Sequence, residues 1–344
     1  MISSAERRDL GRILTAVQND AHGEGADAAP YYRQAGAGIS VAALTGPPGA
    51  GKSSLLDRIA SHWADGGQRV AVLAVDPSSP FSGGAVLGDR IRANTATSHP
   101  NVYMRSLSAR ASLDSLITAV VDSCAVFARF GFDRVLLETV GAGQMNLEAL
   151  DLADCVIGVS VPGLGDAVQL SKAGMLEIAD IHVVNKCDLD GARKLHAGLE
   201  SMLDVAYPAP GHDFSDLRRN RPGVKALLLR HGDPGKESNW RPPVLSASAA
   251  EGAGIDAICE AVGRFLDWQA ATGRHQDRRH ARLANVLSIR LRQKLLRDWK
   301  RKEGNALAEL AAEIAAGRLD PQAAVRQLTA GDDAPQRARK GEAT

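Results

Sequence analysis

Short runs of Val, Ile, Leu and Ala alternate with helix-length segments through the middle of the chain. Because a helix between two strands returns the chain to the same edge of a sheet, this alternation favours a mainly parallel sheet covered by helices on both faces. The sequence therefore predicts an α/β fold over residues 39–270. The predicted strands cover residues 40–45, 70–75, 134–138, 155–160, 181–184 and 243–246.

Helical patterns flank this α/β domain at both ends. Ser3 and Glu6 have the spacing of a capping box, which predicts a helix that runs to about Val17. After the domain, a basic segment with leucines near one side predicts a long helix, and two shorter helices follow it. These three helices are expected over residues 277–303, 305–316 and 321–328. The predicted parts are an N-terminal helical extension and linker (1–38), the α/β domain (39–270), a C-terminal helical arm (271–330) and a disordered tail (331–344).

The first predicted strand runs into the pattern Gly-x-x-x-x-Gly-Lys-Ser, which is typical of a phosphate-binding loop. Glycines let successive backbone N–H groups curl around a β-phosphate, and the following helix directs its positive end at the same anion. Lys52 adds a full positive charge, and the Ser53 hydroxyl can hold Mg²⁺. The expected nucleotide contacts are Gly46, Pro48, Gly49, Ala50, Gly51, Lys52, Ser53 and Ser54.

A second nucleotide motif, Asn-Lys-x-Asp, follows a later strand and indicates guanine. The Asp188 carboxylate can accept hydrogen bonds from N1–H and the exocyclic amine of guanine, a donor pair that adenine lacks. Asn185 would brace the loop or reach N7, and the Lys186 stem would lie over the base. Ser248 and Ala249 follow the last strand, where a contact to guanine O6 is expected. Together these motifs predict a GTPase that binds GTP and GDP.

Acidic residues after two other strands are candidates for the metal site. Asp76, Asp89 and Glu138 carry hard oxygen donors that suit Mg²⁺, although Asp76 and Asp89 each also fit a helix cap or a turn. The Gly141 N–H can sense the γ-phosphate, and Gln144 is a candidate for orienting water. No residue stands out as a general base, so slow intrinsic hydrolysis is expected. The predicted metal ligands are Ser53, Asp76, Asp89 and Glu138, and the predicted catalytic residues are Lys52, Glu138 and Gln144.

Several longer segments resemble the MeaB/ArgK family of P-loop GTPases. They include Glu-Thr-Val-Gly at 138–141, the stretch from Asp76 to Arg90, Pro-Gly-x-Gly-Asp at 162–166 and Trp-Arg-Pro-Pro-Val at 240–244. The resemblance runs from about residue 5 to residue 328. It implies GTP hydrolysis coupled to an adenosylcobalamin-dependent acyl-CoA mutase, whose cofactor loading the protein gates and which it protects or reactivates.

The same resemblance implies a homodimer held partly by the C-terminal helical arm. It also implies a third switch, in which Asp166 and Lys172 relay the nucleotide state to the mutase; as a bare pattern, this Gly/Pro segment also fits a plain strand-to-helix connection. The chain departs from the family pattern at residues 142–148, at Ala173 and over 211–239. These departures leave the mutase open: methylmalonyl-CoA mutase is the default, and a 2-hydroxyacyl-CoA or isobutyryl-CoA mutase is an alternative.

Composition agrees with a cytoplasmic enzyme. The chain has 344 residues, of which 44% are hydrophobic, and a formal net charge of +1. No run approaches the length of a membrane span, the N-terminus is polar rather than a signal peptide, and the four cysteines are widely spaced, as expected of reduced thiols. We therefore expect no membrane partner.

Two other functions are considered, and each needs a sequence feature for which this chain gives little support. A nickel or cobalt metallochaperone GTPase needs clustered thiolates or imidazoles for its cargo, whereas the nine histidines here are scattered. A nucleic-acid-binding GTPase could use the basic segment from Arg274 to Lys302. However, Trp299 is the single Phe, Trp or Tyr of that segment, so few rings could stack on bases, and the overall charge of the chain is near zero. We expect a solvent-exposed charged helix face there and no nucleic-acid partner.

Overall fold

The structure is a computed structural model, and it divides the chain into two compact units, Met1–Val286 and Leu287–Thr344. It describes residues 1–20, 29–34, 39–76, 96, 98–108, 113–138, 152–163, 175–207, 230–231, 239–302 and 305–329. The predicted tail over 331–344 lies outside the described residues.

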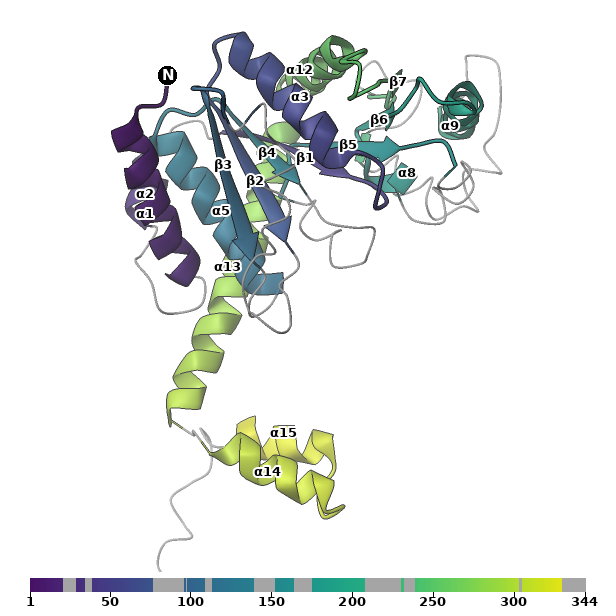
Figure 1. Ribbon diagram of the computed structural model, residues 1–344. Coiled ribbons are helices and arrows are strands. Elements are labelled where there is room, and N and C mark those ends of the chain that lie inside the picture. Colours follow the sequence, from purple (N-terminus) through teal and green to yellow (C-terminus); the bar gives the residue numbers. More distant parts are fainter. Residues whose placement is uncertain are drawn as a thin grey trace, which may run out of the picture. The chain divides into compact units, whose positions relative to one another are not determined.

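A seven-stranded sheet forms the centre of the first unit (Figure 1). The strand order is β3-β2-β4-β1-β5-β6-β7, and every neighbouring pair is parallel. The predicted α/β fold is therefore confirmed, with a sheet that is parallel throughout. The strands are β1 (Ser40–Thr45), β2 (Val70–Asp76), β3 (Val102–Ser108), β4 (Arg134–Glu138), β5 (Cys155–Ser160), β6 (Ile181–Val184) and β7 (Val244–Ser246).

The edge strand β3 is the one strand of this sheet that the apolar pattern does not predict. Its sequence carries Arg105 and two serines among its apolar residues. The N-terminal helix α1 (Ser4–Asp20) supplies partners for this polar edge, because the Arg105 guanidinium donates to Thr15 Oγ1 at 2.9 Å and to Gln18 Oε1 at 3.2 Å. A strand covered in this way does not need a continuous apolar sequence.

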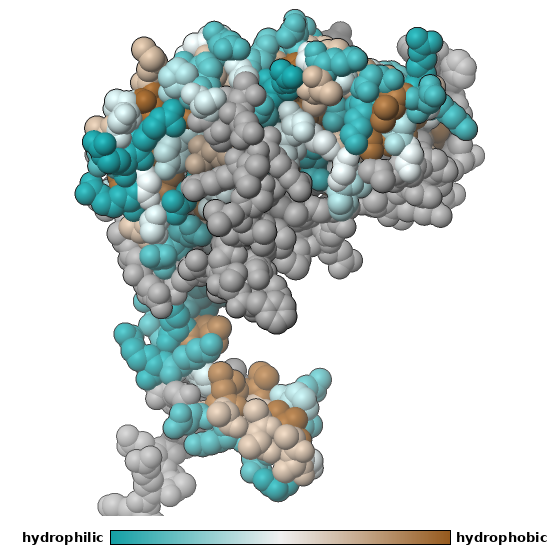
Figure 2. All heavy atoms as spheres, viewed as in Figure 1, coloured by the Kyte–Doolittle hydropathy of each residue, from teal (hydrophilic) through white to brown (hydrophobic). Residues whose placement is uncertain are grey.

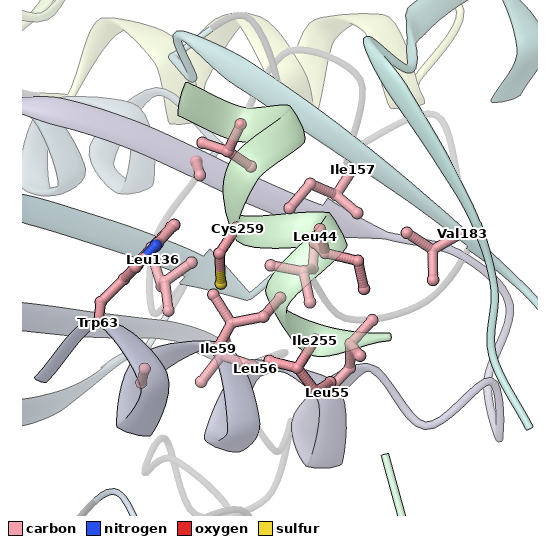
Figure 3. Packing of buried hydrophobic residues seen from close by; sticks show 14 of the residues in the cluster. Leu44, Leu55, Leu56, Ile59, Trp63, Leu136, Ile157, Val183, Ile255 and Cys259 are labelled. Atoms are coloured by element: carbon pink, nitrogen blue, oxygen red, sulfur yellow. The ribbon is translucent and has the colours of Figure 1, made fainter. Parts of the chain in front are cut away.

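Side chains alternate between the two faces of the sheet, and each face has its own helices (Figure 1). The helices α3 (Lys52–Asp65) and α12 (Ile255–Ala271) pack on one face. Figure 3 shows this core, in which Leu44, Leu136 and Ile157 of three neighbouring strands meet Ile59 of α3 and Ile255 of α12. The opposite face packs on α5 (Leu113–Arg129), as the 5.9 Å ring contact between Tyr103 and Phe127 indicates. The other helices described in this unit are α2 (Ala29–Gln34), α8 (Met175–Ile178), α9 (Ala192–Ala206) and the part of α13 (Arg274–Lys302) up to Val286.

The capping box predicted at the start of α1 is confirmed. The Ser3 N–H donates to Glu6 Oε2 at 2.8 Å, and the Glu6 N–H donates to Ser3 Oγ at 3.2 Å. The hydrogen bond from the Ser3 backbone, followed by the one from Arg69, lowers the pKa of Glu6 to about 2. The helix therefore begins where the sequence predicts and runs three residues beyond the predicted end.

After α12, the described part of the chain has three helices close to the predicted ranges: α13 (Arg274–Lys302), α14 (Ala306–Ala315) and α15 (Pro321–Thr329). In the second unit, the Trp299 indole N–H donates to the Leu328 carbonyl at 3.3 Å. Figure 2 shows hydrophobic residues gathered on the viewed surface of α14 and α15. In the part of the chain that the structure describes, no helix is long and apolar enough to cross a membrane.

Candidate nucleotide-binding site

The loop between β1 and α3 has a backbone that only glycine accepts at its key positions. Gly46 has φ of +151°, and a Cβ placed there would lie 2.2 Å from the Val159 carbonyl oxygen. Gly49 and Gly51 have φ of 77° and 81°, in the left-handed region. The glycines of the motif thus let the loop curl tightly beside β5 and leave its N–H groups free of side-chain crowding.

Lys52 lies across this loop. Its Nζ donates to the carbonyl oxygens of Gly46 at 2.9 Å and Pro47 at 3.0 Å. Burial lowers the pKa of Lys52, and the nearby Glu138 carboxylate opposes that shift. The ammonium group is therefore held at the mouth of the loop, where phosphate oxygens can replace the two carbonyls as its partners.

Two oxygen-bearing side chains meet beside the loop. Ser53 lies in the first turn of α3 and Glu138 ends β4, and the Ser53 hydroxyl donates a hydrogen bond to Glu138 Oε1. A hydroxyl and a buried carboxylate next to a phosphate loop form a hard-oxygen donor set that fits Mg²⁺. Among the described residues, no group of three or more His, Cys, Asp or Glu side chains could hold a metal ion by itself. Phosphate and water oxygens would have to complete such a site.

Asn185 connects the phosphate loop to the loop after β7. Its Nδ2 donates to the Ala50 carbonyl at 2.8 Å, and its Oδ1 accepts the Ala249 N–H at 3.1 Å. Its own backbone N–H donates to the Ser160 carbonyl at 2.8 Å. The sequence leaves two roles for Asn185, bracing the loop or reaching N7, and these contacts are those of a residue that braces the loop. A Cβ at Gly51 would lie 2.5 Å from Asn185 Nδ2, so this close approach also requires glycine.

A cavity of about 400 Å³ lies beside these loops. The exposed Asp188 is at its wall, and Lys186 has φ of 56°, which turns the chain sharply between Asn185 and Asp188. Two backbone bonds hold this turn, Cys187 N–H to the Ala247 carbonyl and Leu189 N–H to the Lys186 carbonyl, both at 3.0 Å. The lining residues are Gly51, Ser54, Asp57, Arg58, Asn185, Lys186, Asp188, Leu189, Ser248, Ala249 and Ala250.

The structure thus brings the phosphate loop, Glu138, the Asn-Lys-x-Asp segment and the Ser248-Ala249 segment to the carboxyl edge of the sheet, where α/β folds bind ligands. Asp76 ends β2, but its side chain lies outside the described residues. The candidates Asp89, Gly141, Gln144, Asp166 and Lys172 also lie outside the described residues.

Four residues that line the cavity are absent from the sequence prediction: Asp57, Arg58, Leu189 and Ala250. Asp57 Oδ1 accepts the Ala96 N–H at 2.7 Å, and Arg58 bonds to the loop after β7. The available signal is helical spacing: Arg58 lies one turn after Ser54 on the helix that the phosphate loop starts. That spacing indicates that Arg58 and Ser54 share one face of α3, but it does not identify the residues to which Arg58 bonds.

A phosphate loop at the end of a central parallel strand, combined with a cavity lined by an Asn-Lys-x-Asp segment, is typical of a P-loop GTPase. Comparison with known families gives the particular class. Residues 10–304 match the family model described as methylmalonyl Co-A mutase-associated GTPase MeaB, and the chain belongs to this family.

Individual relatives agree with that assignment. A relative in Pyrococcus abyssi, named as a GTPase, is 36% identical over 282 residues, which are 82% of this chain and 79% of its own. The GTPase ArgK of Escherichia coli is 31% identical over 288 residues, 83% of this chain and 80% of its own. The fused isobutyryl-CoA mutase of Cupriavidus metallidurans is 37% identical over 237 residues, 66% of this chain but 22% of that larger protein.

The fold also matches a solved structure. The crystal structure of an LAO/AO transport system kinase aligns with a TM-score of 0.58 and 22% identity, over 97% of this chain and 100% of that one. This likeness supports the architecture of a parallel sheet with N-terminal and C-terminal helices.

Proposed function

We propose that this GTPase is a nucleotide-dependent switch for an adenosylcobalamin-dependent acyl-CoA mutase. In this role it gates the loading of the cofactor and protects or reactivates the mutase. The observation that carries the proposal is the fused isobutyryl-CoA mutase, in which a segment similar to this chain is part of a mutase polypeptide. Fusion of two activities in one chain favours a physical association where they are separate. The MeaB family description supports the same kind of partner.

The nucleotide site would perform the switch chemistry as follows. Lys52 would neutralise charge on the β- and γ-phosphates, and Asp188 would select guanine. Ser53 and Glu138 would hold Mg²⁺, with Asp76 and Asp89 as further candidates from the sequence. The metal would withdraw charge from the phosphate oxygens.

Loss of the γ-phosphate would release the segments that it holds, as in other GTPase switches. We assign Gly141 to sensing the γ-phosphate, Gln144 to orienting the attacking water, and Asp166 and Lys172 to the relay toward the mutase. The assignments of Asp166 and Lys172 rest on the family resemblance, whereas those of Gly141 and Gln144 rest on their place in the sequence after β4. Hydrolysis by the protein alone would be slow, because no side chain of the described site is placed as an obvious base.

We also propose a homodimer that uses the C-terminal arm. Leu287, Leu291 and Leu295 are 67%, 57% and 60% exposed and recur every four residues of α13, so they form one apolar stripe. Such a stripe on a long helix is typical of an interface between subunits. Leu291→Glu together with Leu295→Glu should convert a dimer into a monomer that still binds GTP. Light scattering would measure this, with Arg264→Glu on the exposed face of α12 as the control. A full-length protein that is already monomeric would refute the dimer.

The proposed partner is tested by cofactor transfer. The purified protein would be mixed with methylmalonyl-CoA mutase or with isobutyryl-CoA mutase, and the uptake of adenosylcobalamin by each apo-mutase would be followed by absorbance. We expect uptake by one of them to depend on whether GTP, GDP or no nucleotide is present. Lys52→Ala should remove that dependence. Nucleotide-independent uptake by these two mutases and by a 2-hydroxyacyl-CoA mutase would contradict the proposal.

A further inference from the structure

Two buried aspartates hold the first turns of α13 against the sheet. Arg278 donates to the Asp180 carboxylate at 3.4 Å and to the Asp154 carbonyl at 3.0 Å, and Arg282 donates to the Asp154 carboxylate. Both arginine side chains are themselves largely buried, at 20% and 12% exposed. Hydrogen bonds between charged groups are strong where water is excluded. The start of α13, residues 274–286, which we call the arm root, is therefore fixed to the first unit.

These two aspartates lie at the amino ends of neighbouring strands. Asp154 directly precedes β5, and Asp180 directly precedes β6. Each carboxylate also accepts a backbone N–H of the sheet, Asp154 from Val41 at 2.8 Å and Asp180 from Val156 at 2.7 Å. The arm root is thus connected to the backbone of three adjacent strands, β1, β5 and β6.

The opposite end of β6 leads to Asn185, the residue that braces the phosphate loop. The four buried residues of β6 separate Asp180 from Asn185, and five steps of about 3.3 Å place the two residues about 16 Å apart. Asn185 bonds to the Ala50 carbonyl and to the Ser160 carbonyl at the end of β5. Because a close-packed interior transmits strain, a displacement of Asp180 along β6 would reach the loop that holds phosphate.

We infer that the arm root controls how tightly the protein holds nucleotide, and that Arg278 is the positioning residue of this coupling. An attached root fixes β6 and therefore the Asn185 brace. A detached root would leave the phosphate loop with a less rigid support, so nucleotide would dissociate faster. Coupling between two sites is reciprocal, so bound nucleotide would also hold the root in place. This inference depends on the nucleotide site and not on the proposed mutase or dimer.

Arg278→Ala is the variant that tests this coupling with the least damage to the core. In the described part of the chain, Asp180 keeps its bonds from Arg230 and His231 when Arg278 is removed. The Asp154 carbonyl keeps its bond from Gln269. No buried acceptor of Arg278 is left without a donor, and we therefore expect the variant to fold.

The first measurement is the rate at which a fluorescent GDP analogue leaves the full-length protein. We expect Arg278→Ala to accelerate release about fivefold or more. Lys294→Ala is the matched control, because Lys294 is an exposed cation farther along α13 whose partner Asp298 belongs to the same helix. Its release rate should stay within about twofold of the original value. Unchanged release from Arg278→Ala, even with a lower melting temperature, would overturn the inference, because Arg278 would then serve stability alone.

The second measurement uses the unmutated protein and needs no variant to fold. Hydrogen exchange of the backbone amides in the arm root would be followed with and without GDP. We expect GDP to slow this exchange by at least the factor by which Arg278→Ala raises the dissociation constant of GDP. Exchange in the root that GDP does not change would overturn the inference. Failure of the unmutated protein to bind GDP would instead refute the nucleotide site itself.

Discussion

The Ser53 hydroxyl donates a hydrogen bond to the Glu138 carboxylate across 85 positions of sequence. The contact joins the first turn of α3 to the end of β4, and β4 is paired with β1, the strand that delivers the phosphate loop. Any movement of β4 relative to α3 would change the distance between these two oxygen donors. The candidate metal site is therefore also a contact between α3, which follows the phosphate loop, and β4, which lies beside β1 in the sheet.

The Ser53 and Glu138 pair predicts how nucleotide binding depends on Mg²⁺. Ser53→Ala should remove one oxygen donor and reduce the gain in GTP affinity that Mg²⁺ provides by about tenfold or more, while binding in excess chelator changes little. Isothermal titration with and without Mg²⁺ measures the difference. Ser54→Ala is the neighbouring control, because Ser54 is exposed and lines the base cavity. An unchanged Mg²⁺ effect in Ser53→Ala would exclude Ser53 as a ligand.

Asp188 should set the choice of base. In Asp188→Asn the side chain offers an amide, which matches the two-position oxygen of xanthine better than the amine of guanine. We expect GDP affinity to fall by at least about tenfold and xanthosine diphosphate affinity to rise. Competition binding measures both. Asp190→Asn, a neighbouring exposed acid outside the cavity lining, should leave both affinities unchanged.

Gly46 and Gly263 make a matched pair for stability. Gly46→Ala would place a Cβ 2.2 Å from a backbone oxygen of β5, so we expect a loss of unfolding free energy of about 3 kcal/mol. Gly263 lies inside α12 with nothing within 4 Å of an added Cβ, so Gly263→Ala should stabilise by about 0.5–1 kcal/mol. Urea unfolding measures both changes. Equal stability of the two variants would contradict the close packing of the loop on β5.

His182 predicts how stability responds to acid. It is fully buried, and among the described residues neither ring nitrogen has a hydrogen-bond partner. Burial, followed by the charge of His231, lowers the pKa of His182 to about 4, while Asp180 opposes the shift. The ordinary pKa of histidine is 6.5, so between pH 6.5 and pH 4 the folded state binds fewer protons at His182 than the unfolded state does. The stability that a neutral His182 contributes is therefore lost as the pH falls from 6.5 to 4.

We expect His182→Leu to make the unfolding free energy less dependent on pH in the same window. Urea unfolding at several pH values measures this, and His280→Leu on the exposed face of α13 is the control. A pH dependence that stays the same in His182→Leu would assign the acid sensitivity to other groups.

The features that the sequence predicts well are local ones. The phosphate loop, the capping box at Ser3 and Glu6, and four of the six predicted strands, with bounds that match, each depend on residues close together in the chain. β3 is not predicted from the sequence, because Arg105 of this strand bonds to side chains of α1 that are far away in the chain. A pattern of neighbouring residues does not contain that information. Arg58 escapes for the same reason, since it bonds to Ala249 across 191 positions. The sequence leaves two roles open for Asn185, because the contact that braces the loop joins it to Ala50, 135 positions away.

In the proposed function, a mutase controls the GTPase activity of this protein. The direct measurement is the steady-state rate of GTP hydrolysis with and without the cognate mutase, for the unmutated protein, Lys52→Ala, Asp166→Ala and Lys172→Ala. We predict that the mutase accelerates hydrolysis by the unmutated protein, that Lys52→Ala is inactive in both conditions, and that Asp166→Ala and Lys172→Ala bind GTP normally but lose most of the acceleration. A rate of GTP hydrolysis that no cobalamin-dependent acyl-CoA mutase changes would contradict the account.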